Sequence, residues 1–436
     1  MIGLLRDEEA AVVKNGKSKP IREGAGPGQL WLQLPGLVRE ALYETVIAAG
    51  LACVDEVLEV ERSGLCGARY QHVAERQALR AGHVASSLTL GGRRVAVSRP
   101  RVRSVNGHEL SLPSWREWSM RDPLTERAVE QMVLGVSTRR YARSLEALPP
   151  AAAVRGISKS AVSERFVYGT ERKLTELMSR ELSGLSLSAL LIDGVHFGEH
   201  VVLAAVGVDE RGEKHVLGLR EGATENATAV RALLADLIER GLDSEHSLLV
   251  VIDGAKALHK AVVEVFGAQA LIQRCREHKK RNVSEALPER LRASVRTTMN
   301  QAYATRDAKR ARRLLDNLAR RLEDQHPGAA ASLREGLDET LTVMRLGLPD
   351  NLERVLSSTN LIENLFSRVR EIGRRVRRWQ SGTMVLRWSA AGMLEAERAF
   401  RKIAGYRAMP LLVAALRARD AKTEREPTVD DGEKAA

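Results

Sequence analysis

The spacing of hydrophobic and polar residues changes several times along the chain, and each change marks a different kind of structure. Over residues 32–61 the apolar positions recur at helical spacing, which predicts helices. Residues 88–103 alternate instead on both sides of Gly91 and Gly92, and this pattern predicts a β-hairpin.

A second helical stretch contains two short sequences in which Gly and Ser stand just ahead of a helix. They are residues 135–139 and 156–160, and the arrangement is typical of a helix-turn-helix. Ser158 can cap the second helix. Lys159 and Arg165 would then face a DNA major groove, although such turns also occur in helical domains that bind no DNA.

The pattern changes again near residue 185, where short apolar runs alternate with amphipathic segments. Two of these runs end in an acid, Asp193 and Asp253, which predicts buried strands with a carboxylate at the C-terminal tip. The expected elements are strands over residues 187–193, 200–208 and 213–219, a helix over 226–240, a strand over 247–253, a helix over 255–266 and a strand over 269–275. This is the element order of a ribonuclease-H-like fold, and it can bring both acids to one edge of the sheet.

The segment after the last of these strands has a different character. Residues 282–345 are rich in Arg and Ala and helical in their spacing, so we interpret them as an insertion domain. The chain then returns with a capping sequence at 357–360 and a helix that contains Glu363. The last stretch, 419–436, is polar and predicted to be disordered.

The sequence therefore predicts an α/β protein with a ribonuclease-H-like catalytic core built on a mixed sheet. An all-α insertion interrupts this core, and a mainly helical DNA-binding region precedes it. The expected divisions are a loose segment at 1–30, a helical DNA-binding region with the hairpin at 31–120, a helix-turn-helix-like region at 121–183, the first part of the core at 184–281, the insertion at 282–350, the second part of the core at 351–410 and a tail at 411–436.

Charge and composition narrow the class of partner. The 436 residues include 68 Lys and Arg against 56 Asp and Glu, a formal net charge of +12. This charge favours a nucleic acid or an anionic membrane surface, although a merely basic soluble protein has the same composition. No stretch reaches about 18 consecutive apolar residues, and residues 1–20 lack a signal-peptide pattern. We therefore expect no membrane partner and, with only three cysteines, a cytoplasmic protein associated with the nucleoid.

Asp193, Asp253 and Glu363 are the candidates for chemistry. Cleavage of a phosphodiester needs an activated oxygen nucleophile and neutralised charge on the phosphate, and two divalent ions held by carboxylates provide both. Each acid alone has a structural alternative. An Asp after a strand often forms a turn or caps a helix, and Glu363 can complete a capping box that begins at Asn360. The joint pattern of two strand-end acids and a helical Glu favours a metal site.

Basic side chains accompany these candidates. Several arginines follow Glu363 on the same helical stretch, where they can grip the DNA backbone or only form a solvated face. The hairpin carries five more, which suit either phosphates or a charged edge strand. The side chains for which we expect DNA contacts are Arg139, Lys159, Arg165, Lys279, Arg281, Arg368, Arg374, Arg375 and Arg378.

Cys275 and His278 form a C-x-x-H sequence. A structural zinc site usually needs four ligands, and no second pair of such residues stands nearby. We therefore expect both side chains to pack near the active edge of the sheet.

Together these residues resemble the Mutator-type family of bacterial insertion-sequence transposases, in the D-D-E class. The matching blocks are residues 136–139, 192–194, 216–219 with Glu225, 251–254, 273–278 with Arg281 and Asn282, and 358–363 followed by Arg374 and Arg375. The resemblance runs from about residue 70 to 401 and is most specific over 193–378.

The resemblance implies that Asp193, Asp253 and Glu363 are the catalytic residues and the metal ligands. It also implies two Mg²⁺ ions, for which Mn²⁺ can substitute, and a homodimer that binds the terminal inverted repeats of its element and target DNA. In the implied reaction, water first cleaves at an element end to free a 3′-hydroxyl. That hydroxyl then attacks a second phosphodiester, with no covalent enzyme–DNA intermediate.

Two other functions stay open for the same pattern. A ribonuclease-H-like, structure-selective nuclease would keep the fold, but it would lack the helical insertion and the upstream DNA-binding region. A non-catalytic DNA-binding protein derived from a transposase would not need all three carboxylates. An acid-phosphatase-like haloacid enzyme is excluded, because it needs a second Asp two residues after the first, where Val195 stands.

Overall fold

The computed structural model describes residues 27–71, 78–90, 93–120, 123–145, 154–155, 158–223, 226–374 and 376–425. The chain forms two compact units, residues 1–122 with 145–155 and residues 123–144 with 156–436. Most of the predicted loose segment lies outside the described residues, as do Gly91 and Gly92 of the predicted hairpin turn, Glu225 and Arg375.

The first unit combines a long helix with a small antiparallel sheet. Its elements are α1 (Pro27–Cys66), β1 (Ala78–Leu90), β2 (Arg93–Ser104), β3 (Glu109–Leu110), α2 (Pro113–Met120) and β4 (Val154–Arg155). Helix α1 confirms the helical prediction, and β1 and β2 form the predicted hairpin, with Leu90 paired to Arg93. Strand β1 begins at Ala78, ten residues before the predicted start at residue 88. Its register shifts between Arg80 and His83, where Gly82 has a φ of 78°. This bulge interrupts the alternation that marks a strand in the sequence.

The second unit begins with two helices in the region for which the sequence predicts a helix-turn-helix. They are α3 (Pro123–Val133) and α4 (Lys159–Met178), with the 3-10 turn η1 (Tyr141–Ser144) between them. Ser158 caps α4 as predicted, and its side chain accepts a hydrogen bond from the backbone N–H of Ala161. Residues 135–139 lead into η1, and residues 146–153 and 156–157 lie outside the described part, so the helix-turn-helix stays a prediction.

A five-stranded mixed sheet forms the middle of the second unit. Its strands are β5 (Leu187–Phe197), β6 (His200–Asp209), β7 (Lys214–Glu221), β8 (Leu248–Ile252) and β9 (Ala270–Arg274), in the spatial order β7-β6-β5-β8-β9. Neighbours among β5, β6 and β7 are antiparallel, whereas β8 is parallel to both β5 and β9. All five predicted strands are present, and the mixed α/β class is confirmed.

Strand β5 is longer than predicted, so Asp193 does not lie at its tip. The pairing of β5 with β8 ends at Ile192, but its pairing with β6 continues to Phe197. The edge on which Asp193 lies is therefore set by the end of the neighbouring strand β8.

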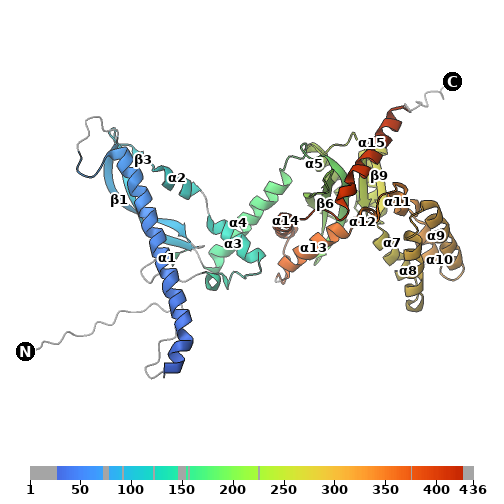
Figure 1. Ribbon diagram of the computed structural model, residues 1–436, viewed down its shortest axis with the longest axis horizontal. Helices are drawn as coiled ribbons and strands as arrows, with labels where there is room; N and C mark the ends of the chain where they lie inside the picture. Colours follow the sequence, from blue (N-terminus) through green and yellow to red (C-terminus); the bar gives the residue numbers. More distant parts are fainter. Residues whose placement is uncertain are drawn as a thin grey trace, which may run out of the picture. The chain divides into compact units, whose positions relative to one another are not determined.

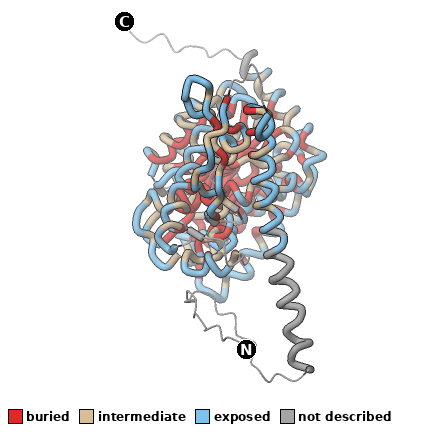
Figure 2. Tube along the Cα trace, turned by 90° about the vertical axis from the view of Figure 1, so that its left-hand side faces the viewer, coloured by how far each residue is buried: buried red, intermediate tan, exposed pale blue. Residues whose placement is uncertain are grey.

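Helices cover both faces of this sheet (Figure 1). Figure 2 shows buried stretches in the interior and exposed ones around them. The helices are α5 (Ala227–Glu239) and α6 (Lys256–Phe266) on one face, and α12 (Asp350–Leu356), α13 (Asn360–Gly373), α14 (Gly382–Arg398) and α15 (Met409–Arg425) on the other. Successive strand residues face opposite sides. Thus Leu190 and Ile192 pack toward α5 and α6, whereas Leu191 and Val195 pack toward the helices on the opposite face, α12 to α15.

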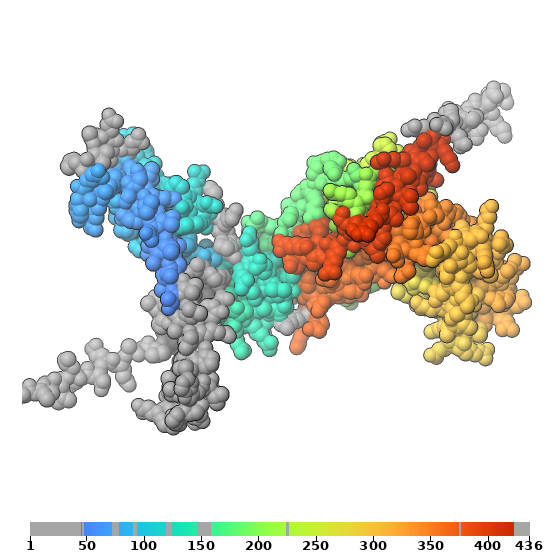
Figure 3. Space-filling model, viewed as in Figure 1, coloured from blue at the N-terminus to red at the C-terminus, as the bar shows by residue number. Residues whose placement is uncertain are grey.

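The segment between β9 and α12 is helical, as predicted. Its elements are α7 (Arg276–Glu285), α8 (Glu289–Tyr303), α9 (Ala308–Glu323), α10 (Pro327–Arg334), the 3-10 turn η3 (Asp338–Leu341) and α11 (Thr342–Arg345). These helices share a hydrophobic core of their own. Helices α8, α9 and α10 form a lobe that projects from the sheet-containing part of this unit (Figure 3).

The chain does not become a loose tail after residue 411. Helix α15 continues to Arg425, and its Leu412 and Leu416 are buried against the sheet. The predicted tail was wrong up to Arg425, because polar side chains there bond to the core. The Asp420 carboxylate, for example, accepts a hydrogen bond from the Ser247 N–H over 2.8 Å. Residues 426–436 lie outside the described part. Among the described helices, none combines the length and apolar character that a membrane span requires.

Candidate active site

Asp193 and Asp253 lie side by side at one edge of the sheet. The last parallel pair between β5 and β8 joins Ile192 to Ile252, and an aspartate follows each of them. Asp193 is two residues after Leu191, and Asp253 is two residues after Val251; both of these apolar residues pack in the layer that includes α12. Every second residue of a strand faces the same side of the sheet. Strand register alone therefore directs both carboxylates toward the same side of the sheet.

Local backbone groups hold one oxygen of each aspartate. Oδ1 of Asp193 accepts a hydrogen bond from the Gly194 N–H, and Oδ1 of Asp253 accepts one from the Ala255 N–H, each over 2.8 Å. Asp253 does form a turn, as its structural alternative suggested, but the cap residue of α6 is Ala255. Orienting bonds of this kind fix the carboxylates without using all of their acceptor capacity.

Glu363 reaches the same edge from α13. Ile362 and Phe366 on this helix are buried against the sheet, which leaves the Glu363 side chain 35% exposed above it. The capping-box alternative does not fit, because the cap residue of α13 is Thr359 and not Asn360, and no side-chain cap hydrogen bond forms there.

The three acids line one cavity of about 400 Å³. The other side chains around it include His196, His278, Arg281, Ser367 and Arg370. The acids that the sequence singled out therefore meet in space, although the chain separates Asp253 from Glu363 by a whole helical lobe.

Asp193 is largely buried where it lines this cavity. Burial raises the pKa of this carboxyl to about 6, against the attraction of His278, and the nearby Asp253 and Glu363 raise it further. A cation bound among the three acids would favour the charged form of each carboxyl group.

The donor set fits hard divalent cations. Carboxylate oxygens are the ligands that Mg²⁺ prefers, and three acids leave positions for water and for phosphate oxygens. Among the described residues, the carboxylate oxygens of Asp193, Asp253 and Glu363 do not all lie within 4.8 Å of one another. One ion therefore cannot contact all three acids in this arrangement, whereas two ions about 3.5–4 Å apart can divide the acids between them.

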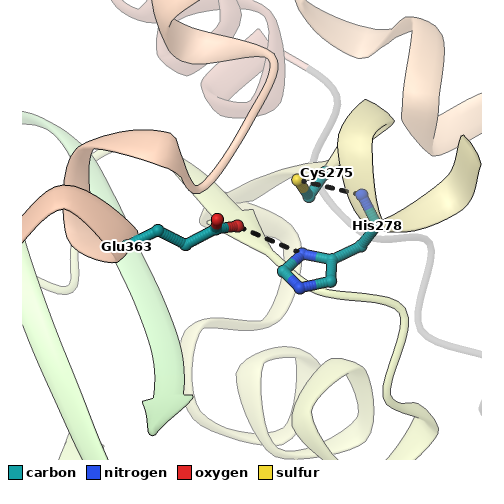
Figure 4. A group of neighbouring side chains, drawn as sticks. All are labelled: Cys275, His278 and Glu363. Carbon is teal, nitrogen blue, oxygen red and sulfur yellow. Dashed lines mark hydrogen bonds and ion pairs between the residues drawn. The ribbon is translucent and has the colours of Figure 1, made fainter. Parts of the chain in front are cut away.

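Cys275 and His278 lie beside Glu363, close to the cavity that the three acids line (Figure 4). Cys275 caps α7, and Nδ1 of His278 is 3.8 Å from Oε1 of Glu363. The hydrogen bond to Cys275 raises the pKa of His278 to about 9, and Asp193 and Glu363 add to the shift. Burial alone would raise the pKa of the Cys275 thiol, but hydrogen bonds from His278 and Thr359 outweigh it and lower that pKa.

The expected DNA-contacting side chains are mostly at the surface. Arg281 lines the cavity. The exposed members of the predicted set are Arg139, Lys159, Arg281, Arg368, Arg374 and Arg378, and Arg165 is partly exposed. Lys279 does not fit the expectation: it is 3% exposed, and its ammonium donates to the carbonyl oxygens of Ser332 and Glu335. Desolvation lowers its pKa to about 8, so Lys279 holds α7 against α10.

Two arrangements near the acids had no signal in the sequence. The Thr359 hydroxyl donates to Oε1 of Glu363 over 3.1 Å, although the pattern around it indicated only a helix cap. Arg274 pairs with Glu339 from η3 and donates to the carbonyl oxygen of Gly254, beside Asp253. The first bond is local, between residues four apart, whereas the pairing of Arg274 with Glu339 joins residues 65 apart and follows only from the fold.

Comparison with known proteins agrees with this geometry. The family model described as "Transposase, Mutator family" matches residues 37–400. A transposase for insertion sequence element ISRM5 of Rhizobium meliloti (strain 1021) is 28% identical over 322 residues, 73% of this chain and 79% of that protein. The transposase for IS1081 of Mycobacterium tuberculosis (strain ATCC 25618 / H37Rv) is 29% identical over 356 residues, 78% of this chain and 80% of that protein. The transposase for IS406 of Burkholderia multivorans (strain ATCC 17616 / 249) is 27% identical over 361 residues, 78% and 88% of the two chains.

Proposed function

This chain belongs to the Mutator family of transposases, and we propose that it is a DDE transposase that cleaves and joins DNA strands at the terminal inverted repeats of an insertion sequence. The observation that carries the proposal is the cavity at which Asp193, Asp253 and Glu363 meet. The names of the relatives, all transposases for insertion sequence elements, support the same reaction class.

We further propose that the sheet and its helices form a ribonuclease-H-like core. The strand order β7-β6-β5-β8-β9, with three antiparallel strands followed by two parallel ones, supports this assignment. On the same reading, the helical lobe between β9 and α12 is an insertion into the core. It separates Asp253 from Glu363 in the sequence but not in space.

Asp193, Asp253 and Glu363 would hold two Mg²⁺ ions, for which Mn²⁺ can substitute, and these ions supply charge neutralisation and an activated water. The chain itself positions the three carboxylates and places positive charge near the phosphate. The sheet register fixes the two aspartates, and α13 presents Glu363 across from them. Arg281 and Arg370 line the cavity and can offset the charge of the phosphate that is attacked. The same groups would serve both strand cleavage and the later attack by the freed 3′-hydroxyl.

The test uses the full-length protein, Mg²⁺ and DNA that carries the inverted repeats flanking its gene. Three variants replace one acid each: Asp193→Asn, Asp253→Asn and Glu363→Gln. Each is expected to keep DNA binding. The rates of cleavage and joining should fall by well over 100-fold, because loss of a residue that only orients a metal ligand already lowers activity by roughly 10–100-fold. Glu371→Gln is the matched control, because Glu371 is an exposed acid on the same helix.

Each result that contradicts the proposal has its own consequence. A wild-type rate in any of the three variants removes that residue from the ligand set. Cleavage without joining would favour the structure-selective nuclease. DNA binding without cleavage by the unaltered protein would favour the non-catalytic DNA-binding protein.

A further inference from the structure

We propose that Cys275, His278 and Glu363 form a second metal site, for a thiophilic divalent cation such as Zn²⁺, and that it shares Glu363 with the catalytic centre. The sequence argument against zinc was that the C-x-x-H pair lacks partners. The structure supplies one, because α13 brings Glu363 to the pair from more than eighty residues away (363 − 278 = 85).

The separations in this cluster suit a small tetrahedral ion. One ligand atom from each of the three residues lies within 4.8 Å of the others, and Nδ1 of His278 is 3.8 Å from Oε1 of Glu363. Bonds of about 2.0–2.3 Å to zinc place neighbouring ligands about 3.3–3.8 Å apart in a tetrahedron. Each separation therefore needs to contract by at most about 1.5 Å.

A fourth donor atom, the hydroxyl oxygen of Thr359, lies close to all three ligand atoms. Oγ1 of Thr359 is 3.4 Å from Sγ of Cys275, 3.3 Å from Nδ1 of His278 and 3.1 Å from Oε1 of Glu363. This hydroxyl, or a water that replaces it, can complete four-coordination. Figure 4 shows the thiol, the imidazole and the carboxylate directed toward one region.

The donor set selects the class of cation. A thiolate and an imidazole favour Zn²⁺ and similar ions, whereas Mg²⁺ prefers oxygen ligands. The catalytic cavity provides access, because His278 and Glu363 both line it although Cys275 is buried behind them. The hard and soft donors thus form adjoining sites with one carboxylate in common.

This sharing has a consequence that rests on the proposed function. A cation bound to Cys275 and His278 draws the Glu363 carboxylate away from Asp193 and Asp253. Zn²⁺ at this site would then inhibit the Mg²⁺-dependent reaction while leaving DNA binding intact.

The site is tested first without DNA. The metal-free, reduced full-length protein is titrated with Co²⁺, whose visible bands report tetrahedral geometry and whose near-ultraviolet charge-transfer band reports a thiolate ligand. We expect one site per chain, displaced by Zn²⁺. The band is expected in Cys53→Ser, which alters an exposed cysteine, and absent from Cys275→Ser. Glu363→Gln should weaken affinity by at least about tenfold, or 1.4 kcal/mol.

The outcomes decide the inference. Absence of a thiolate band from the wild type, or its persistence in Cys275→Ser, overturns the site. If Cys275→Ser does not fold by circular dichroism, His278→Asn is read in its place with the same expectation. An unchanged Co²⁺ affinity in Glu363→Gln overturns the shared ligand.

The second arm measures cleavage with Mg²⁺ at increasing Zn²⁺. Half-inhibition is expected near the Zn²⁺ dissociation constant, and it should move at least about tenfold higher in Cys275→Ser relative to that variant's own uninhibited rate. Zinc that binds without inhibiting contradicts the sharing of Glu363. If the protein shows no Mg²⁺-dependent cleavage at all, the proposed function fails, whereas the cobalt titration still decides the site.

Discussion

The hydroxyl of Thr359 donates a hydrogen bond to Oε1 of Glu363 over 3.1 Å. Thr359 itself is fully buried, and its backbone N–H donates to Sγ of Cys275. One residue thereby connects the start of α13 to the start of α7 and restricts the rotamer of the Glu363 carboxylate. Partners of this kind orient metal ligands and affect metal affinity almost as strongly as the ligands do.

Replacing Thr359 by Val is expected to lower Mg²⁺-dependent cleavage by about 10–100-fold. Val keeps the shape of the side chain and removes only the hydroxyl, so folding and DNA affinity should change little. The loss should be greatest at low Mg²⁺, and Thr359→Ser should restore most of the rate because it restores the donor. Cleavage rates are measured against Mg²⁺ concentration; equal rates for the Val and Ser variants would contradict this positioning role.

The sequence predicted the sheet well because buried strands leave a local pattern. The runs that end near Asp193 and Asp253 are almost wholly apolar, and β5 to β9 all appear where expected. The end of β5 was misplaced, because its last residues pair only with β6, and an acid within a strand looks like a strand end. The extension of α15 was missed for a related reason: Asp420 looks like a tail residue but bonds to Ser247.

The candidate site was predictable only in part. The three acids were identified from a joint pattern, since none is distinctive alone. Lys279 was misassigned, because a lysine in a basic sequence resembles a DNA contact, whereas here it donates to two carbonyl oxygens inside the helical lobe. The contact of Glu363 with Cys275 and His278 follows from tertiary packing across the lobe, for which a single sequence carries no local signal.

The pair of Arg276 and Glu353 should be the most costly ion pair to break. Their side chains are 8% and 10% exposed, and Nη1 of Arg276 donates to Oε1 of Glu353 over 2.9 Å. Glu353→Ala leaves the guanidinium charge buried without its partner, which typically costs about 3–5 kcal/mol. Urea unfolding of full-length protein measures the loss. Glu395→Ala, in an exposed pair with Arg398, is the control and should change stability by about 1 kcal/mol or less.

Asp209 should make stability fall in acid. Burial alone would raise its pKa, but the backbone N–H groups of Glu213 and Arg211 and the ring of His215 outweigh it and hold the pKa below 3.8. The charged form is therefore favoured in the folded state. Its contribution is present above the unfolded pKa and is lost as pH falls through the lower folded pKa.

Asp209→Asn removes this charge and should cost about 1–2 kcal/mol at pH 7, the difference between hydrogen bonds to a charged and to a neutral acceptor. The gap between the two proteins should shrink below pH 3.8, where the Asp209 carboxyl is protonated in the unfolded chain before it is in the folded protein. The midpoints of urea unfolding of the unaltered protein and of Asp209→Asn, measured from pH 7 to pH 3, report this difference in stability. A difference that stays constant over that range would show that the charge of Asp209 is not the cause.

Arginines around the cavity should contribute phosphate contacts that are visible in the salt dependence of DNA binding. Arg281 lines the cavity, and Arg368 and Arg374 are exposed on and just after α13. Each phosphate contact adds about 0.9 to the magnitude of the slope of log K against log salt concentration on duplex DNA. Single Ala variants should each lower that magnitude by about 0.9, and a double variant by nearly twice as much, without a change in sequence preference. Arg398→Ala, an exposed arginine paired with Glu395, should leave the slope unchanged. If the three variants match Arg398→Ala, these arginines form only a solvated face, and the DNA lies on another surface.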